Sequence, residues 1–220
     1  MKDSLNATKE KVYSSLSDIA SALGAPARLR IIQVLSNRSS AVEDLSARIG
    51  ESVANTSQHL QKLKKAGLVR VSRSGVSRTY SLTNKNVIDV FLDLQKIGAI
   101  LSPDLQSAES EFCPPELQSK LSLQDVVKAV RKGEATLIDV RDLDEFETNT
   151  APHAIHFPRD EVTKGLKLLS KKKPVFAFCR GRYCILANDV VVQLRKRGYE
   201  AYRLREMAHQ LSTLGSSKEA

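Results

Sequence analysis

The first hundred residues combine a helical period of hydrophobic positions with one stretch that has the period of a strand. Apolar residues recur every three or four positions in five segments, which predicts five helices. The segments are 5–23, 26–34, 40–49 (or 43–49), 52–66 and 87–100. Before the fifth segment the period falls to two, so residues 68–73 and 77–82 are expected to form a hairpin around a turn at Ser74-Gly75. The pattern predicts a mainly helical domain with a β-hairpin directly behind its fourth helix.

The pattern changes in the second half of the chain, where helices and short apolar strands alternate. Helices are expected at 123–131, 162–169 and 185–197, and strands at 136–140, 174–178 and 201–204. Such alternation is typical of a parallel sheet with helices on both faces. The sequence therefore predicts an α/β domain that follows the helical one.

The two patterns are separated by a segment rich in proline. Ser102-Pro103 ends the last helical pattern, and Pro114-Pro115 precedes the first helix of the second half. At 220 residues the chain is long enough for two domains of ordinary size. We expect a first domain at 1–102, a linker at 103–116 and a second domain at 117–215. A linker of this length permits either coupled or independent domains.

The net charge of +9 lies mainly in the first half of the chain. Residues 1–102 hold 15 Lys and Arg against 8 Asp and Glu, whereas residues 103–220 hold 19 against 17. No acidic residue stands between Glu51 and Asp89, although this interval carries seven basic ones. They are Lys62, Lys64, Lys65, Arg70, Arg73, Arg78 and Lys85. A long interval of one sign indicates a polyanionic partner.

The fourth helix and the hairpin carry the side chains expected to contact DNA. Apolar spacing places Val53, Thr56, Leu60 and Leu63 on the inward face of this helix. The candidates for reading base edges in the major groove are Ser52, Asn55, Ser57, Gln58, His59 and Lys62. Arg70, Arg73 and Arg78 on the hairpin are candidates for binding phosphate. For His59 the alternative is a helix-surface residue without a role in binding.

Three motifs in this half resemble the ArsR family of bacterial winged-helix regulators. They are Pro26-Ala27-Arg28-Leu29-Arg30-Ile31-Ile32, Ser57-Gln58-His59-Leu60 and Lys64-Lys65-Ala66-Gly67-Leu68-Val69. The resemblance covers about residues 8–100 and implies a homodimer that binds a palindromic operator in double-stranded DNA. Metal-sensing members carry Cys or His ligands in the third or last helix. Neither 39–49 nor 87–100 contains Cys or His, so we expect no metal site.

The three cysteines, Cys113, Cys179 and Cys184, are too few for a disulfide framework. The sequence shows neither an N-terminal apolar leader nor a stretch long enough to span a membrane, so we expect a cytoplasmic protein without a membrane partner. Cys113 stands beside Pro114 in the expected linker and is predicted to be a free surface thiol. The other two cysteines flank one short loop.

Cys179 stands where a buried strand ends and a short loop leads into a helix. Ligand sites of open α/β sheets lie at this edge. Backbone N–H groups of the loop, the helix dipole, Arg180 and Arg182 are expected to lower the pKa of Cys179 from about 8.5, which predicts a nucleophile. A cysteine that only fills space is the alternative. Cys184 could attack a persulfide on Cys179, or it could simply pack at the helix start.

This half resembles the rhodanese family at Leu137-Ile138-Asp139-Val140-Arg141 with Glu145-Phe146, and at the Cys179-Arg180-Gly181 loop. The resemblance covers about residues 117–212, although 149–158 lacks the usual Gly-His and Glu206-Met207 lacks the usual Trp. It implies that Cys179 takes sulfur from a sulfane-sulfur donor, thiosulfate or a persulfide, and passes it to a thiol acceptor without metal or organic cofactor. Asp139 and Arg141 are expected to brace the loop through a salt bridge. Ile185 replaces the Arg of a Cys-x5-Arg phosphatase, which weighs against phosphate chemistry.

Three functions are compatible with this combination. The first is a DNA-binding transcription regulator, a repressor, in which sulfur loading or oxidation at Cys179 changes operator affinity. The second is a working sulfurtransferase whose DNA-binding half has an autoregulatory or accessory role. The third is a regulator with an inactive, rhodanese-shaped interaction module, which the intact Cys179 loop disfavours.

Overall fold

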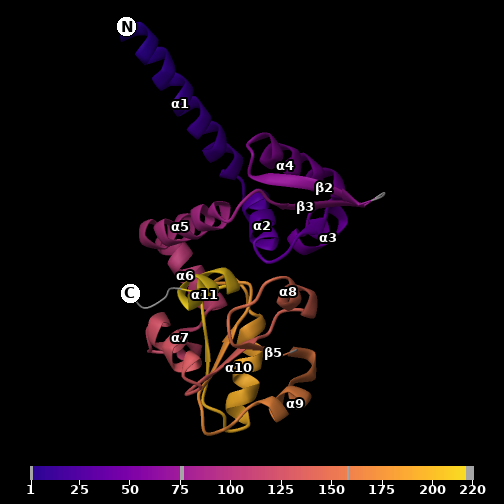
Figure 1. The fold of residues 1–220 in the computed structure, drawn as a ribbon, viewed down its shortest axis with the longest axis vertical. Coiled ribbons are helices and arrows are strands. Elements are labelled where there is room, and N and C mark those ends of the chain that lie inside the picture. Colours follow the sequence, from indigo (N-terminus) through magenta and orange to yellow (C-terminus); the bar gives the residue numbers. More distant parts are fainter. Residues whose placement is uncertain (1, 75–76, 158, 217–220) are drawn as a thin grey trace. The chain divides into compact units, whose positions relative to one another are not determined.

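A computed structural model describes residues 2–74, 77–157 and 159–216 (Figure 1). The chain divides into two compact units, Met1–Lys96 and Ile97–Ala220. The division falls inside helix α5 (Asn86–Leu101), which therefore contributes residues to both units. Gly75 of the predicted hairpin turn lies outside the described residues.

The first unit is a helical domain with a small antiparallel sheet, as the periodicity predicted. Its elements are α1 (Lys2–Leu23), α2 (Pro26–Leu35), β1 (Ser40–Ala41), α3 (Val42–Ile49), α4 (Val53–Lys65), β2 (Val69–Ser74) and β3 (Ser77–Leu82), followed by α5. The hairpin strands β2 and β3 pair in antiparallel register, and β1 adds to the edge of β3. Ser40 therefore begins a strand, and the third helix starts only at Val42.

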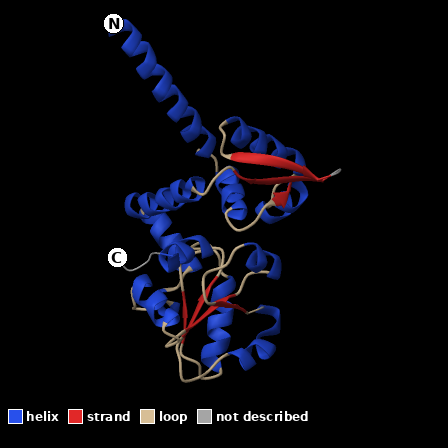
Figure 2. Ribbon diagram, in the orientation of Figure 1, coloured by secondary structure: helices blue, strands red, loops and turns tan. Residues whose placement is uncertain are grey.

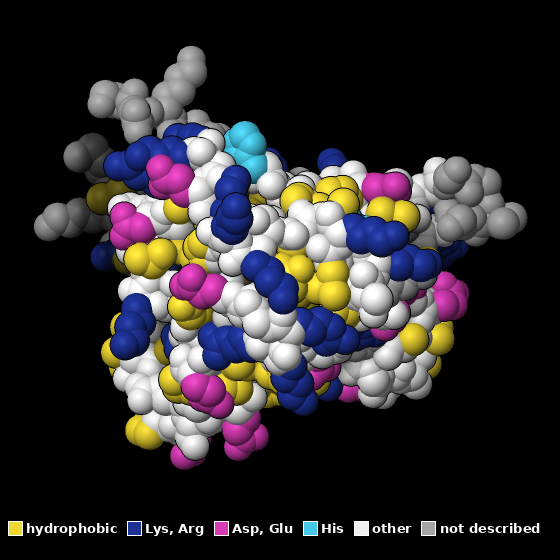
Figure 3. All heavy atoms as spheres, turned by 90° about the horizontal axis from the view of Figure 1, so that it is seen from below, with side chains coloured by type: hydrophobic (Ala, Val, Ile, Leu, Met, Phe, Trp, Pro, Cys, Tyr) yellow, Lys and Arg dark blue, Asp and Glu magenta, His cyan; other side chains and the backbone are white. Residues whose placement is uncertain are grey.

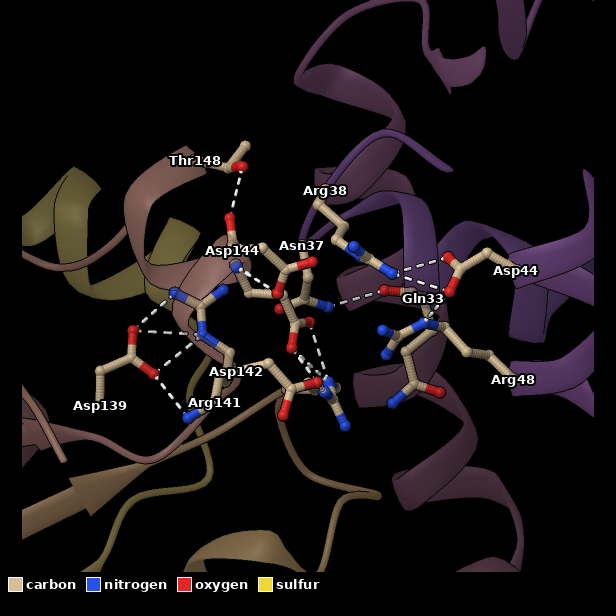
Figure 4. A network of polar contacts seen from close by, with 12 residues as sticks. Gln33, Asn37, Arg38, Asp44, Arg48, Asp139, Arg141, Asp142, Asp144 and Thr148 are labelled. Atoms are coloured by element: carbon tan, nitrogen blue, oxygen red, sulfur yellow. Dashed lines mark hydrogen bonds and ion pairs between the residues drawn. The ribbon is translucent and has the colours of Figure 1, made fainter. Parts of the chain in front are cut away.

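The core of the first unit forms where α2, α3 and α4 meet. Ile31, Ile32, Leu45, Leu60 and Leu63 are completely buried there. Thr56 is buried as predicted, but Val53 is 45% exposed and does not belong to the inward face. The reason is its position in the first turn of α4, directly after the Ser52 cap, where the helix has only begun to cross the core. After α2, Arg38 binds both carboxylate oxygens of Asp44 at 2.8 Å (Figure 4).

The second unit is built on a four-stranded parallel sheet in the order β5-β4-β6-β7 (Figure 2). The strands are β4 (Thr136–Asp139), β5 (Ala154–His156), β6 (Val175–Phe178) and β7 (Ala201–Arg203). The helices are α6 (Pro103–Phe112), α7 (Leu123–Arg131), α8 (Leu143–Thr148), α9 (Val162–Gly165), α10 (Leu186–Lys196) and α11 (Ala208–Ser216), with short 3-10 turns at Pro115–Leu117, Arg159–Glu161 and Leu166–Leu168.

Alternate residues of the strands pack against helices on opposite faces of this sheet. Ile138 and Ala177 belong to the core that α10 covers, whereas Leu137 and Phe176 belong to the core that α7 and α11 cover. The predicted parallel sheet with helices on both faces is confirmed. On the face drawn in Figure 3, basic and acidic side chains are interspersed with hydrophobic ones. None of the described helices is both long and apolar enough to span a bilayer.

Helix α6 occupies the interval where the sequence predicted a linker. The Ser102 side chain caps the helix by accepting a hydrogen bond from the Leu105 N–H, and Pro103 stands in its first turn. A Ser-Pro pair suits a helix start as well as a helix stop, because proline needs no hydrogen-bond partner in the first turn. The periodicity also missed the strands β1 and β5 and the helices α8 and α11, and 162–169 splits into α9 and a 3-10 turn.

Candidate functional site

The side chains predicted to contact base edges lie along α4. Asn55, Gln58 and Lys62 are exposed, whereas Ser57 and His59 are half-buried. Ser52 is the N-cap, since its hydroxyl accepts a hydrogen bond from the Asn55 N–H at 3.1 Å. The Ser52 hydroxyl is therefore already engaged in starting the helix, which leaves the other polar side chains to face a ligand.

The hairpin presents its arginines on strands β2 and β3. Arg73 and Arg78 stand directly opposite each other in the register, and both are exposed. Like charges in facing positions destabilise a sheet unless an anion lies between them. Arg70 is also exposed, and its Nε donates to Ser81 Oγ at 3.1 Å. The hairpin thus offers a pair of positive charges suited to phosphate, with a third fixed nearby on β2.

The second candidate site is the loop between β6 and α10, residues 179–184, which we call the cysteine loop. Cys179 follows the last residue of β6 and is completely buried, whereas Cys184 is half-buried just before α10. Gly181 turns the loop at a φ of 102°, a conformation that favours glycine. The Cys179 thiol donates to the Cys184 carbonyl at 3.5 Å, and both cysteines are free.

The pKa values of the two thiols are shifted in opposite directions. The pKa of Cys184 falls to about 6, because the Cys179 side chain donates a hydrogen bond to it and the N–H groups of Leu186 and Arg180 point to it. The hydrogen bond with Cys184 and complete burial raise the pKa of Cys179 well above its ordinary value. The expected lowering of the Cys179 pKa is therefore wrong in this state, although the Ala187 N–H and the start of α10 do favour an anion there.

The two arginines of the loop point to carboxylates. Arg180 binds Glu145 and Asp142 of the α8 segment, with Nε 2.8 Å from Glu145 Oε1 and Nη2 2.6 Å from Asp142 Oδ2. Arg182 Nη1 lies 3.2 Å from Oε2 of Glu109, a buried residue of α6. The side chains expected to activate Cys179 instead hold the loop to two helices.

Two residues of this site were not predicted from the sequence. Glu109 lay in the expected linker, and it pairs with Arg205 as well as Arg182. Arg203, at the end of β7, is 1% exposed and donates to three carbonyl groups of the cysteine loop. A charged residue inside a short apolar strand was the available signal for Arg203. Glu109 carried no comparable signal.

Asp139 and Arg141 form the predicted ion pair at the end of β4, and both side chains are completely buried (Figure 4). Thr150 Oγ1 donates to Asp139 Oδ2 at 2.8 Å, and Arg141 also donates to the Asn149 carbonyl. The pair thus fixes the turn before β5, and its bracing of the cysteine loop stays a prediction. Cys113 is completely buried after α6, so the expected surface thiol is wrong. Its carbonyl accepts a hydrogen bond from Gln118, which anchors this segment to the second unit.

Comparison with known proteins assigns both halves. Residues 25–71 match the model of the bacterial regulatory protein arsR family, and residues 122–206 match the rhodanese-like domain. HTH-type transcriptional regulator Rv0324 of Mycobacterium tuberculosis is 29% identical over 197 residues, which cover 89% of this chain and 86% of that protein. Uncharacterized HTH-type transcriptional regulator Rv0081 of the same species is 31% identical over 96 residues, 43% of this chain and 84% of that protein. A tRNA sulfurtransferase of Desulfurococcus amylolyticus is 27% identical over 164 residues, which cover 74% of this chain and 28% of that enzyme.

The basic helix and hairpin of the first unit, together with the parallel sheet of the second, define a winged-helix regulator joined to an α/β domain. The chain belongs to the arsR family of bacterial regulatory proteins and carries a C-terminal rhodanese-like domain.

Proposed function

We propose that this chain is a transcription regulator in which sulfur loading at Cys179 changes affinity for operator DNA. One observation carries the proposal. Cys179 is completely buried, so a donor reaches it only when the cysteine loop moves, and Arg182 ties that loop to Glu109 of α6. A single residue, Ser102, separates α6 from α5, the last helix of the winged-helix pattern. A change in the loop therefore has a short covalent route to the DNA-binding half.

The chemistry uses the two thiols without an outside oxidant. Cys184 as a thiolate takes the proton of Cys179, and the Cys179 sulfur attacks the outer sulfur of a persulfide donor, whose thiolate leaves. Cys179 then carries a persulfide. Attack by Cys184 on the Cys179 Sγ forms a disulfide and expels hydrosulfide, so two thiols are oxidised while the transferred sulfur is reduced. A thiol acceptor that attacks the persulfide instead restores the starting state.

The test is to treat the full chain with glutathione persulfide, map the modified cysteines by mass spectrometry and titrate the same samples against promoter DNA. We expect modification at Cys179 and a fall in DNA affinity of about tenfold, within the usual range of coupling between two sites. Cys179→Ser removes the response, and Cys184→Ser keeps the persulfide but forms no disulfide. Equal responses of the wild type and Cys179→Ser would contradict the proposal.

DNA binding itself is proposed to use α4 for base edges and the hairpin for phosphates. Arg78→Gln should weaken binding to all sequences alike and lower the slope of affinity against salt by about one, because one phosphate contact is lost. Gln58→Ala should relax specificity at one base pair by roughly 1–3 kcal/mol. Fluorescence anisotropy at several salt concentrations measures both, with Lys132→Gln, exposed at the end of α7 in the second unit, as the control. An unchanged salt slope for Arg78→Gln would remove the hairpin from the interface.

We propose that the DNA-binding form is a homodimer that binds a palindrome. Helices α1 and α5 each leave a row of apolar side chains uncovered on the isolated chain. The row on α1 consists of Leu5, Val12, Tyr13, Leu16 and Ile19, and the row on α5 of Val90, Leu94, Ile97, Ile100 and Leu101. Exposed apolar rows of this size mark protein interfaces. Sedimentation of the purified chain measures its oligomeric state.

The second candidate function is a sulfurtransferase whose DNA-binding half is accessory. The sequence similarity to a tRNA sulfurtransferase over 74% of the chain favours it. Steady production of sulfite from thiosulfate, unaffected by operator DNA, would support this function over the sensor. A single stoichiometric loading that changes DNA affinity would support the sensor.

A further inference from the structure

Arg203 is a buried arginine in contact with the backbone of the cysteine loop. It pairs with Ala177 across β6 and β7, so it stands near the same sheet edge as Cys179. Its Nη2 lies 3.2 Å from the Gly181 carbonyl oxygen, 3.3 Å from that of Arg182 and 2.5 Å from that of Cys184. One nitrogen thus binds three carbonyl groups of the loop and fixes the orientation of three peptide planes.

The Cys184 carbonyl group contacts both Arg203 and Cys179. This oxygen accepts hydrogen bonds from both Arg203 Nη2 and the Cys179 thiol. Arg203 therefore holds in place a carbonyl group that lies 3.5 Å from the Cys179 sulfur. Its positive charge also lowers the pKa of Cys179, against the stronger raising effects of Cys184 and burial.

The charge of Arg203 has no carboxylate partner among the described side chains. Three other arginines near the loop have one: Arg141 pairs with Asp139, Arg180 with Glu145 and Arg182 with Glu109. The Nε and Nη1 donors of Arg203 are also buried without a hydrogen-bond partner in the described structure. A buried cation without a counter-charge is strongly unfavourable. The nearby group that can supply a negative charge is the cysteine pair.

We infer that Arg203 is a positioning residue, which serves as the counter-charge of the thiolate shared by Cys179 and Cys184 and holds their loop closed. The inference deepens the proposed function and rests on it for its biological use. It predicts that loss of the charge at position 203 makes the cysteine pair harder to ionise, whether or not sulfur is ever transferred.

The test measures thiol ionisation in the full chain by alkylation with iodoacetamide across a pH series. Trypsin cuts after Arg180 and Arg182, so Cys179 and Cys184 are quantified on separate peptides. In the wild type, alkylation of Cys184 should be half-maximal near pH 6, where its pKa lies at about 6. Arg203→Gln and Arg203→Met should raise the midpoint by about one unit, which slows alkylation about tenfold below both midpoints.

Two further variants separate the charge from the fold. Arg203→Lys keeps the charge and should keep the wild-type midpoint. Arg195→Gln removes another arginine that donates to backbone carbonyls, those of Ala201 and Glu116, and should leave the midpoint unchanged. A thermal melt accompanies each variant. If Arg203→Met does not fold, comparing the alkylation midpoints of Arg203→Gln and Arg203→Lys still tests whether the charge stabilises the thiolate.

Two outcomes overturn the inference. A wild-type midpoint in folded Arg203→Gln would show that the charge does not stabilise the thiolate. An equal shift in Arg203→Lys and Arg203→Gln would show that only the geometry of the carbonyl contacts matters. Because the measurement uses neither DNA nor a sulfur donor, its failure is distinct from failure of the proposed function.

Discussion

Replacing Glu109 by glutamine should leave sulfur loading at Cys179 intact while the loaded protein binds operator DNA as tightly as the unloaded one. Glu109 is buried, and its carboxylate pairs with Arg182 at 3.2 Å and with Arg205 at 3.4 Å. The amide of glutamine keeps the shape of the side chain but removes the charge that holds both guanidinium groups. A loop that moves would then no longer displace α6.

Other contacts also join the C-terminal part of α6 to the cysteine loop and to α10. The Phe112 ring lies edge-on to the Tyr183 ring at 6.4 Å, and Asn188 of α10 donates to the Phe112 carbonyl at 3.0 Å. These contacts do not depend on charge, so α6 should stay docked in Glu109→Gln and only the link to Arg182 should weaken. The expected change is therefore in the coupling between sites and not in the fold.

The measurement compares DNA affinity with and without persulfide for each variant, with the loaded fraction determined by mass spectrometry. Persulfide should lower the DNA affinity of the wild type about tenfold, and that of Glu109→Gln by less than about twofold. Glu111→Gln, an exposed neighbour on the same helix, is the matched control and should respond like the wild type. A full response in Glu109→Gln at equal loading would exclude this route between the halves.

The second large effect concerns stability. Asp139→Ala should lower the free energy of unfolding of the second unit by roughly 3–5 kcal/mol, because it leaves the Arg141 guanidinium buried without its counter-charge. Both side chains of the pair are completely buried, with Arg141 Nη2 2.6 Å from Asp139 Oδ2. The guanidinium carbon of Arg141 also lies 5.7 Å from the centre of the Phe178 ring.

Urea unfolding followed by circular dichroism measures this loss. The double variant Asp139→Leu with Arg141→Met should recover much of it, since a buried ion pair replaced by apolar side chains of similar volume is often neutral. Asp160→Ala removes the acid of an exposed pair, Arg159 and Asp160, and should cause no measurable change. Unfolding of Asp139→Ala at the wild-type urea concentration would contradict the buried-pair argument.

The periodicity of the sequence determined most of the architecture. The apolar positions of α4 recur with a helical period, and those of β2 and β3 with a period of two. Each period shows which face of the element is buried, and it can be seen in a short stretch of sequence. The same holds for the alternating strands and helices of the second unit. Short elements such as β5 and α8 carry too few residues to show a period, and α6 begins at a Ser-Pro pair that also suits a break.

The sequence also singled out Cys179 and Cys184 as candidate reactive residues, because a strand end followed by a glycine turn and a helix is a local pattern. It did not determine which charges and hydrogen bonds act on each sulfur. The positive neighbours Arg180 and Arg182 are adjacent in sequence, but their charges are directed to Glu145 and Glu109, which lie 35 and 73 residues away along the chain.

Only the tertiary structure decided how the charges pair. Ionisation of a thiol depends on burial and on every charge within a few ångströms, and neither quantity is visible in the order of the residues. Folding completely buries Cys179, sets Cys184 in hydrogen-bond contact with it and brings Arg203 of β7 beneath the loop carbonyls. The sequence predicted where a reactive sulfur would lie, and the packing of the sheet edge decided which charges and hydrogen bonds surround each thiol, since electrostatic interactions act through space and not along the chain.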